Sequence, residues 1–173
     1  MTTFYLVRHG QTLWSLAAQR ALKGWGNDLV PLTPQGIEQI EQVAVGLRGT
    51  NVRLILCSPM TRALQSASIL SRRLDLPLTV EFDLHEWIPD RTFCWQDLAT
   101  VEAAFAEFSQ LGGEWPPGEQ RQWEPRSAIR LRMLGVLTQY GDSPPIVVVS
   151  HSVAISSVTG RPPELAEVSE YRL

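Results

Sequence analysis

Two arginines and two histidines follow three hydrophobic runs of this chain, and these residue types suit the chemistry of a phosphate group. The runs cover residues 4–7, 54–57 and 146–149, and the basic residues after them are Arg8, His9, Arg62 and His151. If the runs are strands of one parallel sheet, their carboxyl ends lie along one edge, which is where open α/β sheets bind ligands. The sequence therefore predicts that the four side chains surround one anion.

Each of these residues can be given a part in phosphoryl transfer, which needs an in-line nucleophile, cations for the equatorial oxygens and a proton for the departing oxygen. His9 could attack phosphorus through a neutral ring nitrogen while an acceptor holds its other N–H. The guanidinium groups of Arg8 and Arg62 match phosphate oxygens in pairs. His151 could donate to a further oxygen, and a helix beginning at Ser152 would add its N-terminal amides.

The proton donor is expected at Glu86, at the exit of a strand predicted at 78–82. The apolar neighbour Trp87 could exclude water and favour the protonated carboxyl group. Asp83 and Asp90 are rival acids in the same segment. A carboxylate that is simply solvated in a loop is the alternative interpretation of Glu86, because acidic loop residues are usually exposed.

The bulk composition favours one globular domain, residues 1–173, with a small anionic ligand. A chain of 173 residues with 44% hydrophobic residues can bury a core of its own. The net charge of −3 leaves no basic surface for nucleic acid or anionic lipid, so we expect neither as a partner. The longest apolar runs are too short to cross a membrane, and with two cysteines and no signal-like N-terminus we expect a reduced, cytoplasmic protein.

The predicted elements that must position these residues alternate between strand and helix. Strands are expected at 3–7, 52–57, 78–82, 146–149 and 168–173, and helices at 33–47, 58–74, 96–110, from 125 onward and after 151. This alternation predicts a three-layer α/β/α sandwich with a mostly parallel central sheet. An exposed last strand could pair with a second copy, so a homodimer is an open expectation.

Residues 86–123 are expected to form an insertion beside the site that faces the substrate. This segment carries four of the six tryptophans, at positions 87, 95, 115 and 123. Their rings could stack on an aromatic substrate, but packing under a long loop is the favoured interpretation.

Four motifs together resemble the histidine phosphatase superfamily, in its phosphoglycerate mutase-like branch. They are Leu-Val-Arg-His-Gly-Gln-Thr at 6–12, Leu-Thr-Pro-Gln-Gly at 32–36, Ser-Pro-Met-Thr-Arg-Ala at 58–63 and Val-Ser-His at 149–151. An isolated Arg-His-Gly would mean little, whereas four motifs in the order of the family are specific.

The resemblance implies a phosphoglycerate mutase-like fold and a role for each matching residue. His9 would be the nucleophile that forms a phosphohistidine, Glu86 the proton donor, and the rest of the phosphate pocket would be Arg8, Arg62 and His151. The resemblance also places Gln11, Thr12 and Ser15 on a first loop near the phosphate, and it implies chemistry without a metal or cofactor.

The sequence departs from the pattern of the family at three places. Ser15 stands where the first loop usually has asparagine, and Ser152, counted with the substrate-binding residues, stands where glycine commonly follows the last histidine. After Glu86 the chain continues with Ile-Pro-Asp-Arg at 88–91 rather than with glycine-rich sequence and a second glutamate.

The function expected from these residues is a metal-independent phosphatase acting on a small phosphomonoester. A cofactor-dependent phosphoglycerate mutase is one alternative, although its branch is usually longer and builds a closed basic pocket. Here Arg91 and Arg121 are the only positive residues between Glu86 and Trp123. A catalytically silent protein that binds a phosphorylated ligand is the other alternative.

Overall fold

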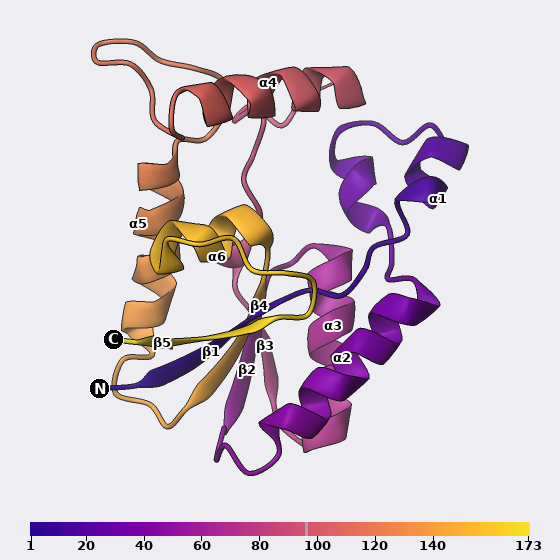
Figure 1. The fold of residues 1–173 in the computed structure, drawn as a ribbon, viewed down its shortest axis with the longest axis vertical. Coiled ribbons are helices and arrows are strands. Elements are labelled where there is room, and N and C mark those ends of the chain that lie inside the picture. Colours follow the sequence, from indigo (N-terminus) through magenta and orange to yellow (C-terminus); the bar gives the residue numbers. More distant parts are fainter. Residues whose placement is uncertain (96) are drawn as a thin grey trace.

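A five-stranded sheet forms the centre of the protein, described here by a computed structural model that covers residues 1–95 and 97–173 (Figure 1). Its strands are β1 (Thr3–Arg8), β2 (Leu54–Cys57), β3 (Leu78–Val80), β4 (Ile146–Ser150) and β5 (Val168–Arg172). Their spatial order is β3-β2-β4-β1-β5, with every neighbouring pair parallel except β1 and β5. Val149 pairs with both Val7 and Cys57, so the carboxyl ends of three strands are level.

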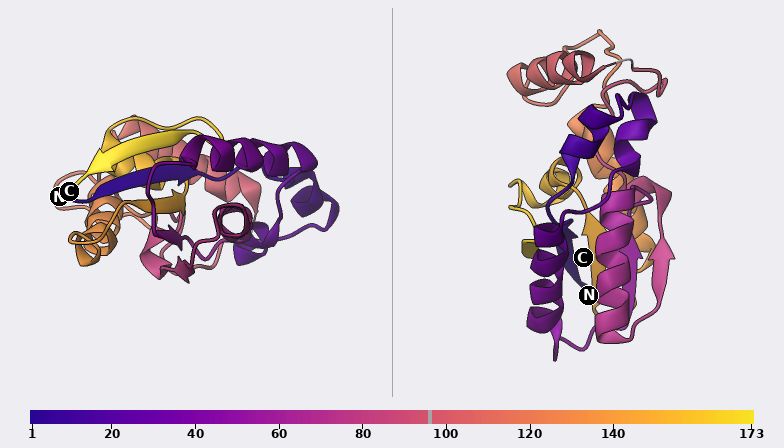
Figure 2. Two further views of the ribbon diagram at one scale, coloured as in Figure 1. Left: turned by 90° about the horizontal axis from the view of Figure 1, so that it is seen from below. Right: turned by 90° about the vertical axis from the view of Figure 1, so that its right-hand side faces the viewer.

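Helices cover both faces of this sheet. On one face lie α2 (Pro34–Leu47) and α3 (Thr61–Leu74), and on the other lie α5 (Arg126–Gln139) and α6 (Ser152–Thr159). The right-hand view of Figure 2 shows α2 and α3 in front of the sheet. Successive residues of the buried strands point to opposite faces, so Leu6 and Val148 join the α5–α6 core while Val7 and Val149 join the α2–α3 core. The predicted three-layer α/β/α fold is confirmed.

Local sequence explains where the helices begin and end. The hydroxyl of Thr33 accepts from the backbone N–H of Gly36 at 2.9 Å and caps α2, and Pro34 occupies its first turn. At the C-terminal end of α3, Asp75 adopts a left-handed backbone conformation that ends the helix.

Three short elements were not predicted. They are α1 (Trp14–Gln19) and the 3₁₀ turns η1 (Gly24–Leu29) and η2 (Phe82–Leu84). The strand expected at 78–82 ends at Val80, because η2 already turns the chain there. Elements of three to six residues are too short to show a hydrophobic period, so the sequence pattern does not reveal them.

The helix α4 (Leu98–Gln110) lies beyond the carboxyl edge of the sheet (Figure 1). It was expected at 96–110, and position 96 lies outside the described residues. Phe108 is its buried residue and packs between Trp87 and Trp123. In the described part of the chain, no helix combines the length and apolar character needed to span a membrane.

Arg132 of α5 fixes the chain just before Glu86. Its guanidinium forms a two-pronged ion pair with Glu124, at 2.7 and 2.9 Å, and donates to the backbone carbonyls of Asp83 and His85 at 2.6 and 2.8 Å. Both side chains of the ion pair are only 10% exposed. The side chain of His85 is buried beside this ion pair.

The loop after β1 lies so close to the start of α2 that both segments need a glycine at the contact. A Cβ on Gly36 would lie 2.2 Å from the carbonyl oxygen of Gln11, and one on Gly10 would lie 2.4 Å from the carbonyl oxygen of Gly36. Because the obstructing atoms are backbone, neither contact can be relieved by a side-chain rotation. This approach holds the loop that follows His9.

We expect Gly36→Ala to lower the free energy of unfolding by about 1–3 kcal/mol, because the added methyl group overpacks this contact. Gly46→Ala is the matched control in the same helix, where a Cβ would meet no atom within 4 Å. That change should stabilise the protein by about 0.5–1 kcal/mol through helix propensity. Urea unfolding followed by tryptophan fluorescence measures both, and equal effects would contradict the close-contact argument.

We expect Arg132→Met to lower the free energy of unfolding by about 3 kcal/mol, because Glu124 would be left as a buried, unpaired charge. Arg73→Met is the control, since the ion pair of Arg73 with Glu41 is exposed and should matter much less. The double variant Arg132→Met with Glu124→Leu should recover much of the loss. A double variant as unstable as the single one would show that the ion pair is not the cause.

Candidate active site

His9 follows β1 at the level carboxyl edge and is buried, with 6% of its surface exposed. Its backbone N–H donates to the carbonyl of Ser150 on the neighbouring strand at 3.1 Å. The Nδ1–H of the ring donates to the carbonyl oxygen of Gly10 at 2.8 Å, which fixes the tautomer and leaves the lone pair on Nε2. This is the arrangement expected of a nitrogen nucleophile.

The surroundings of His9 keep its ring neutral. Burial, together with the positive charge of Arg62, lowers the pKa of His9 to about 3. A neutral imidazole retains the Nε2 lone pair throughout the physiological pH range. The predicted requirement for an unprotonated histidine is therefore met by desolvation and by a neighbouring charge.

Arg62 lies in the first turn of α3 and is also buried. Its Nη1 pairs with Asp28 of η1 at 2.8 Å, and its guanidinium lies 5.3 Å from the ring centre of Trp14. Burial raises the pKa of Asp28, an effect that the charge of Arg62 partly offsets. Asp28 is not among the predicted site residues, because its place beside Arg62 depends on the fold of the unpredicted turn η1.

Three buried nitrogens around His9 have no hydrogen-bond partner among the residues that the structure describes. They are Nε of Arg8, Nε of Arg62 and Nδ1 of His151. Arg8 ends β1 and is otherwise anchored by donation from Nη1 to the carbonyl of Pro163 at 2.8 Å. Arg8 and Arg62 line the same cavity as His9, and the ring of His151 adjoins that of His9. Buried donors are normally satisfied, so these unsatisfied nitrogens indicate a site for an acceptor-rich ligand such as phosphate.

His151 is fully buried between the end of β4 and the start of α6. Its Nε2 lies 2.7 Å from the hydroxyl of Ser58, which itself accepts from the backbone N–H of Met60. If the hydroxyl donates to Nε2, the ring proton of neutral His151 sits on Nδ1 and is free for a ligand oxygen. Burial lowers the pKa of His151 well below its usual value, and its ring centre lies 5.1 Å from that of His9.

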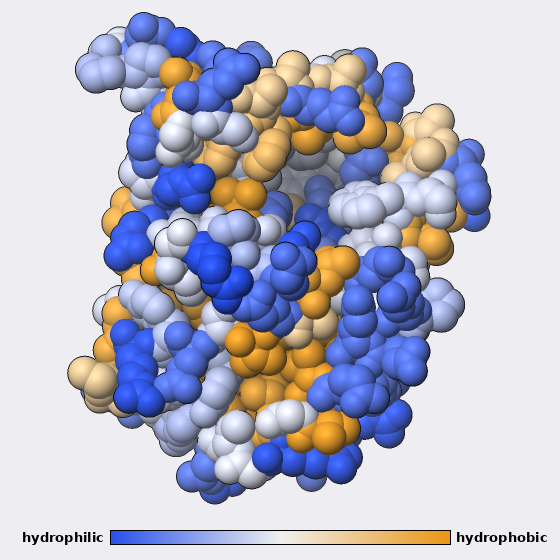
Figure 3. Space-filling view, in the orientation of Figure 1, coloured by the Kyte–Doolittle hydropathy of each residue, from blue (hydrophilic) through white to orange (hydrophobic). Residues whose placement is uncertain are grey.

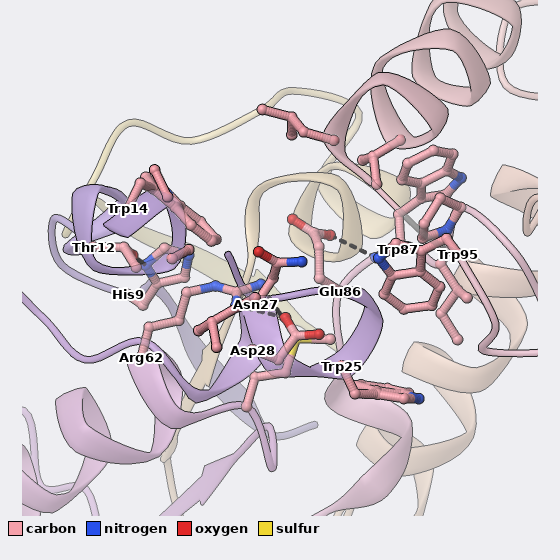
Figure 4. Close-up of a pocket in the computed structure, with 18 of the residues that line it drawn as sticks. His9, Thr12, Trp14, Trp25, Asn27, Asp28, Arg62, Glu86, Trp87 and Trp95 are labelled. Atoms are coloured by element: carbon pink, nitrogen blue, oxygen red, sulfur yellow. Dashed lines mark hydrogen bonds and ion pairs between the residues drawn. The ribbon is translucent and has the colours of Figure 1, made fainter. Parts of the chain in front are cut away.

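Glu86 lies across the cavity from His9, with its carboxylate at the start of α6 (Figure 4). Its oxygens accept from the backbone N–H groups of Trp87, Val153 and Ala154, at 2.8, 3.3 and 3.1 Å. The amides of α6 were expected to face the phosphate, but two of them are taken by Glu86. These three hydrogen bonds hold the carboxylate of Glu86 in place at the start of α6.

The four residues expected to contact the substrate do not all lie together. Gln11 and Thr12 line the cavity beside His9, and the hydroxyl of Thr12 lies 3.4 Å from Nδ1 of His9. Ser15 is exposed on α1, and Ser152 lines a separate cavity between α4, α5 and α6.

The rival acids are placed away from the nucleophile. Asp83 is exposed, and the carboxylate of Asp90 accepts from the backbone and hydroxyl of Thr92. Neither lines the cavity, whereas Asp28 and Glu86 do. Within the described residues no group of three or more histidine, cysteine or acidic side chains is arranged to hold a metal ion.

The cavity that contains His9 has a volume of about 770 Å³. It opens on the face shown in Figure 3, as a hollow between α4 and the α1 region. Two members of the tryptophan cluster, Trp87 and Trp95, line it, and so do Trp14 and Trp25. Trp115 and Trp123 instead pack together under α4, with ring centres 6.4 Å apart. The cluster therefore divides between a cavity wall and a packing core.

Two relatives match nearly the whole chain. A probable phosphoglycerate mutase GpmB from Cronobacter sakazakii is 30% identical over 172 residues, covering 94% of this chain and 77% of that protein. An uncharacterized phosphatase PhoE from Bacillus subtilis is 26% identical, covering 95% of this chain and 81% of that protein.

The fold is shared with solved phosphatases. A mycobacterial glucosyl-3-phosphoglycerate phosphatase, solved as a complex with vanadate, superposes with a TM-score of 0.72 at 20% identity, covering 98% of this chain and 90% of that chain. The family model for the histidine phosphatase superfamily, branch 1, matches residues 4–166, which include every motif of the site. The predicted family is thereby confirmed, and the chain belongs to branch 1 of the histidine phosphatase superfamily.

Proposed function

We propose that this protein is a phosphatase that hydrolyses a phosphomonoester through a phosphohistidine on His9, without a metal ion. The observation that carries the proposal is the neutral ring of His9, with Nδ1–H held by Gly10 and Nε2 uncommitted, among the unsatisfied nitrogens of Arg8, Arg62 and His151. Membership of the family supports the same reaction class.

In the first step, the Nε2 lone pair of His9 forms a bond to phosphorus as the ester P–O bond breaks. The electron pair of that bond goes to the leaving oxygen, which takes a proton from the carboxyl group of Glu86. Arg8, Arg62 and His151 stabilise the negative charge on the equatorial oxygens. The ring of His9 becomes positively charged, and the carbonyl of Gly10 stabilises that charge at Nδ1–H.

In the second step, a water molecule attacks phosphorus on the side that the alcohol has left. Its proton passes to the carboxylate of Glu86, and the N–P electron pair returns to Nε2 of His9. Inorganic phosphate then leaves, with Glu86 protonated for the next cycle.

The small number of cations in the cavity disfavours the mutase reaction. A mutase must retain a phosphorylated carboxylic acid during transfer, and the described residues that line this cavity include only Arg8 and Arg62 as permanent cations. Arg91 lies over the ring of Trp115 and Arg121 pairs with Glu107 and Glu119, so both are committed elsewhere. Hydrolysis therefore fits the charge distribution better than transfer.

We expect His9→Ala to abolish hydrolysis of para-nitrophenyl phosphate and to form no covalent phosphoenzyme, while wild type with a chelator retains full activity. Labelling with ³²P-phosphoester followed by an alkaline quench should trap phosphate on wild type. Because the pKa of His9 is lowered to about 3, labelling should remain at pH 5 as well as pH 7. Activity that survives in His9→Ala would remove His9 from the role of nucleophile.

We expect Glu86→Gln to slow hydrolysis of an alkyl phosphate by about 10²–10⁴-fold, because the alkoxide needs a proton. The same change should affect para-nitrophenyl phosphate much less, since nitrophenolate leaves without one. Asp28→Asn is the matched comparison at the other carboxylate of the cavity. If Asp28→Asn shows this dependence on the leaving group and Glu86→Gln does not, Asp28 is the proton donor.

A further inference from the structure

The cavity has two chemically different ends. One end is the phosphate site around His9, and the other is walled by side chains from α1, η1 and α4 and from the segments just before η1 and α4. The walls of that second end, here called the apolar chamber, are Ala17, Leu22, Trp25, Trp95, Leu98 and Val101. Figure 4 shows Glu86, Asn27 and Asp28 between His9 and the rings of Trp25, Trp87 and Trp95, while Trp14 lies on the side of His9. A substrate with its phosphate on His9 therefore extends its alcohol part into the apolar chamber.

Aromatic contacts hold the rings of one wall of the apolar chamber in place. Trp25 is stacked on Phe93 with ring centres 5.0 Å apart and an interplanar angle of 26°, and it lies 5.8 Å from Trp95. Trp95 is buried, while Trp25 is half-buried and lines the cavity. A flat apolar group could stack here with little rearrangement.

The charges around the chamber oppose a second anionic group on the substrate. Among the described residues that line the whole cavity, Arg8 and Arg62 are the only permanent cations, and Asp28 and Glu86 lie beside them. Two cations and two acidic groups leave no positive charge for a carboxylate or second phosphate once the first phosphate is bound. Phosphoglycerates and bisphosphorylated compounds are therefore unfavourable.

The walls of the apolar chamber offer few hydrogen-bond partners, because the indole N–H groups of Trp25 and Trp95 are the only polar side-chain groups among the wall residues named above. The several hydroxyl groups of a sugar placed there would lose hydrogen bonds to water.

We propose that the substrate is the phosphomonoester of an uncharged, largely apolar alcohol that carries an aromatic group, about the size of two fused rings, in the apolar chamber. This inference rests on the proposed hydrolysis for its first half, the phosphate on His9. The cavity of about 770 Å³ is of the size that holds ligands with tens of atoms, far larger than a three-carbon acid needs.

Phosphonates test the ligand class independently of turnover, because their C–P bond is not cleaved by this reaction. We would measure calorimetric binding of 2-(1-naphthyl)ethylphosphonate, ethylphosphonate and 3-phosphonopropionate to the wild-type protein. The naphthyl compound should bind at least tenfold more tightly than ethylphosphonate, and the carboxylated compound should bind no more tightly than ethylphosphonate.

Two variants locate the effect in the apolar chamber. Trp25→Ala should reduce the advantage of the naphthyl compound at least fivefold and leave ethylphosphonate binding within twofold. Leu98→Lys changes a side chain that is 68% exposed at the mouth of the chamber, and it should strengthen binding of 3-phosphonopropionate several-fold. Leu131→Lys, on an exposed position of α5 outside the cavity, is its control and should change nothing.

Equal binding of the naphthyl and ethyl compounds to wild type would overturn the proposal, and so would tightest binding of 3-phosphonopropionate. Hydrolysis assays with the corresponding phosphate esters distinguish a failure of the proposed ligand class from a failure of the proposed hydrolysis. If the naphthyl preference is present but no ester is hydrolysed, the ligand class is supported and only the proposed hydrolysis fails.

Discussion

The buried guanidinium of Arg62 is the charge on which the site depends. A buried cation is tolerated when it is paired, and its partner Asp28 ties the turn η1 to the first turn of α3. The same charge acts on His9 and helps to lower its pKa to about 3, which keeps the ring neutral. One interaction therefore links the shape of the first loop to the protonation state of the candidate nucleophile.

The second constraint is the competition for the start of α6. A helix N-terminus attracts negative charge, and here the carboxylate of Glu86 takes the amides of Val153 and Ala154 that a phosphate could otherwise use. Arg132 makes this arrangement firm, because it holds the backbone carbonyls just before Glu86. Glu86 thus occupies two N-terminal amides of α6, and in the proposed reaction the phosphate would be bound by Arg8, Arg62 and His151.

The sequence predicts the sheet-edge part of the site well and the remainder poorly. Arg8, His9 and His151 adjoin strands with clear hydrophobic runs, and parallel pairing brings them to one edge. Asp28 and Trp25 come from the turn η1, whose six residues carry no period, and their place in the cavity is decided by contacts with Arg62 and Phe93. Composition likewise identified a tryptophan cluster but not its division into a cavity wall and a packing core.

The two ends of the cavity are built from different elements and are therefore under different structural constraints. The phosphate end is built from strand ends and from the backbone contact between Gly10 and Gly36, so a shift there disturbs the central sheet. Most of the apolar chamber comes from α1, η1 and α4, which lie outside the sheet and are tied to the rest of the fold by the Arg62–Asp28 ion pair and by buried rings such as Phe108. A change at an exposed wall residue such as Leu98 can therefore alter which alcohol is accepted while the geometry around His9 is kept. Under the proposed function, cleavage of the phosphate ester and selection of the alcohol would therefore depend on separable parts of one small fold.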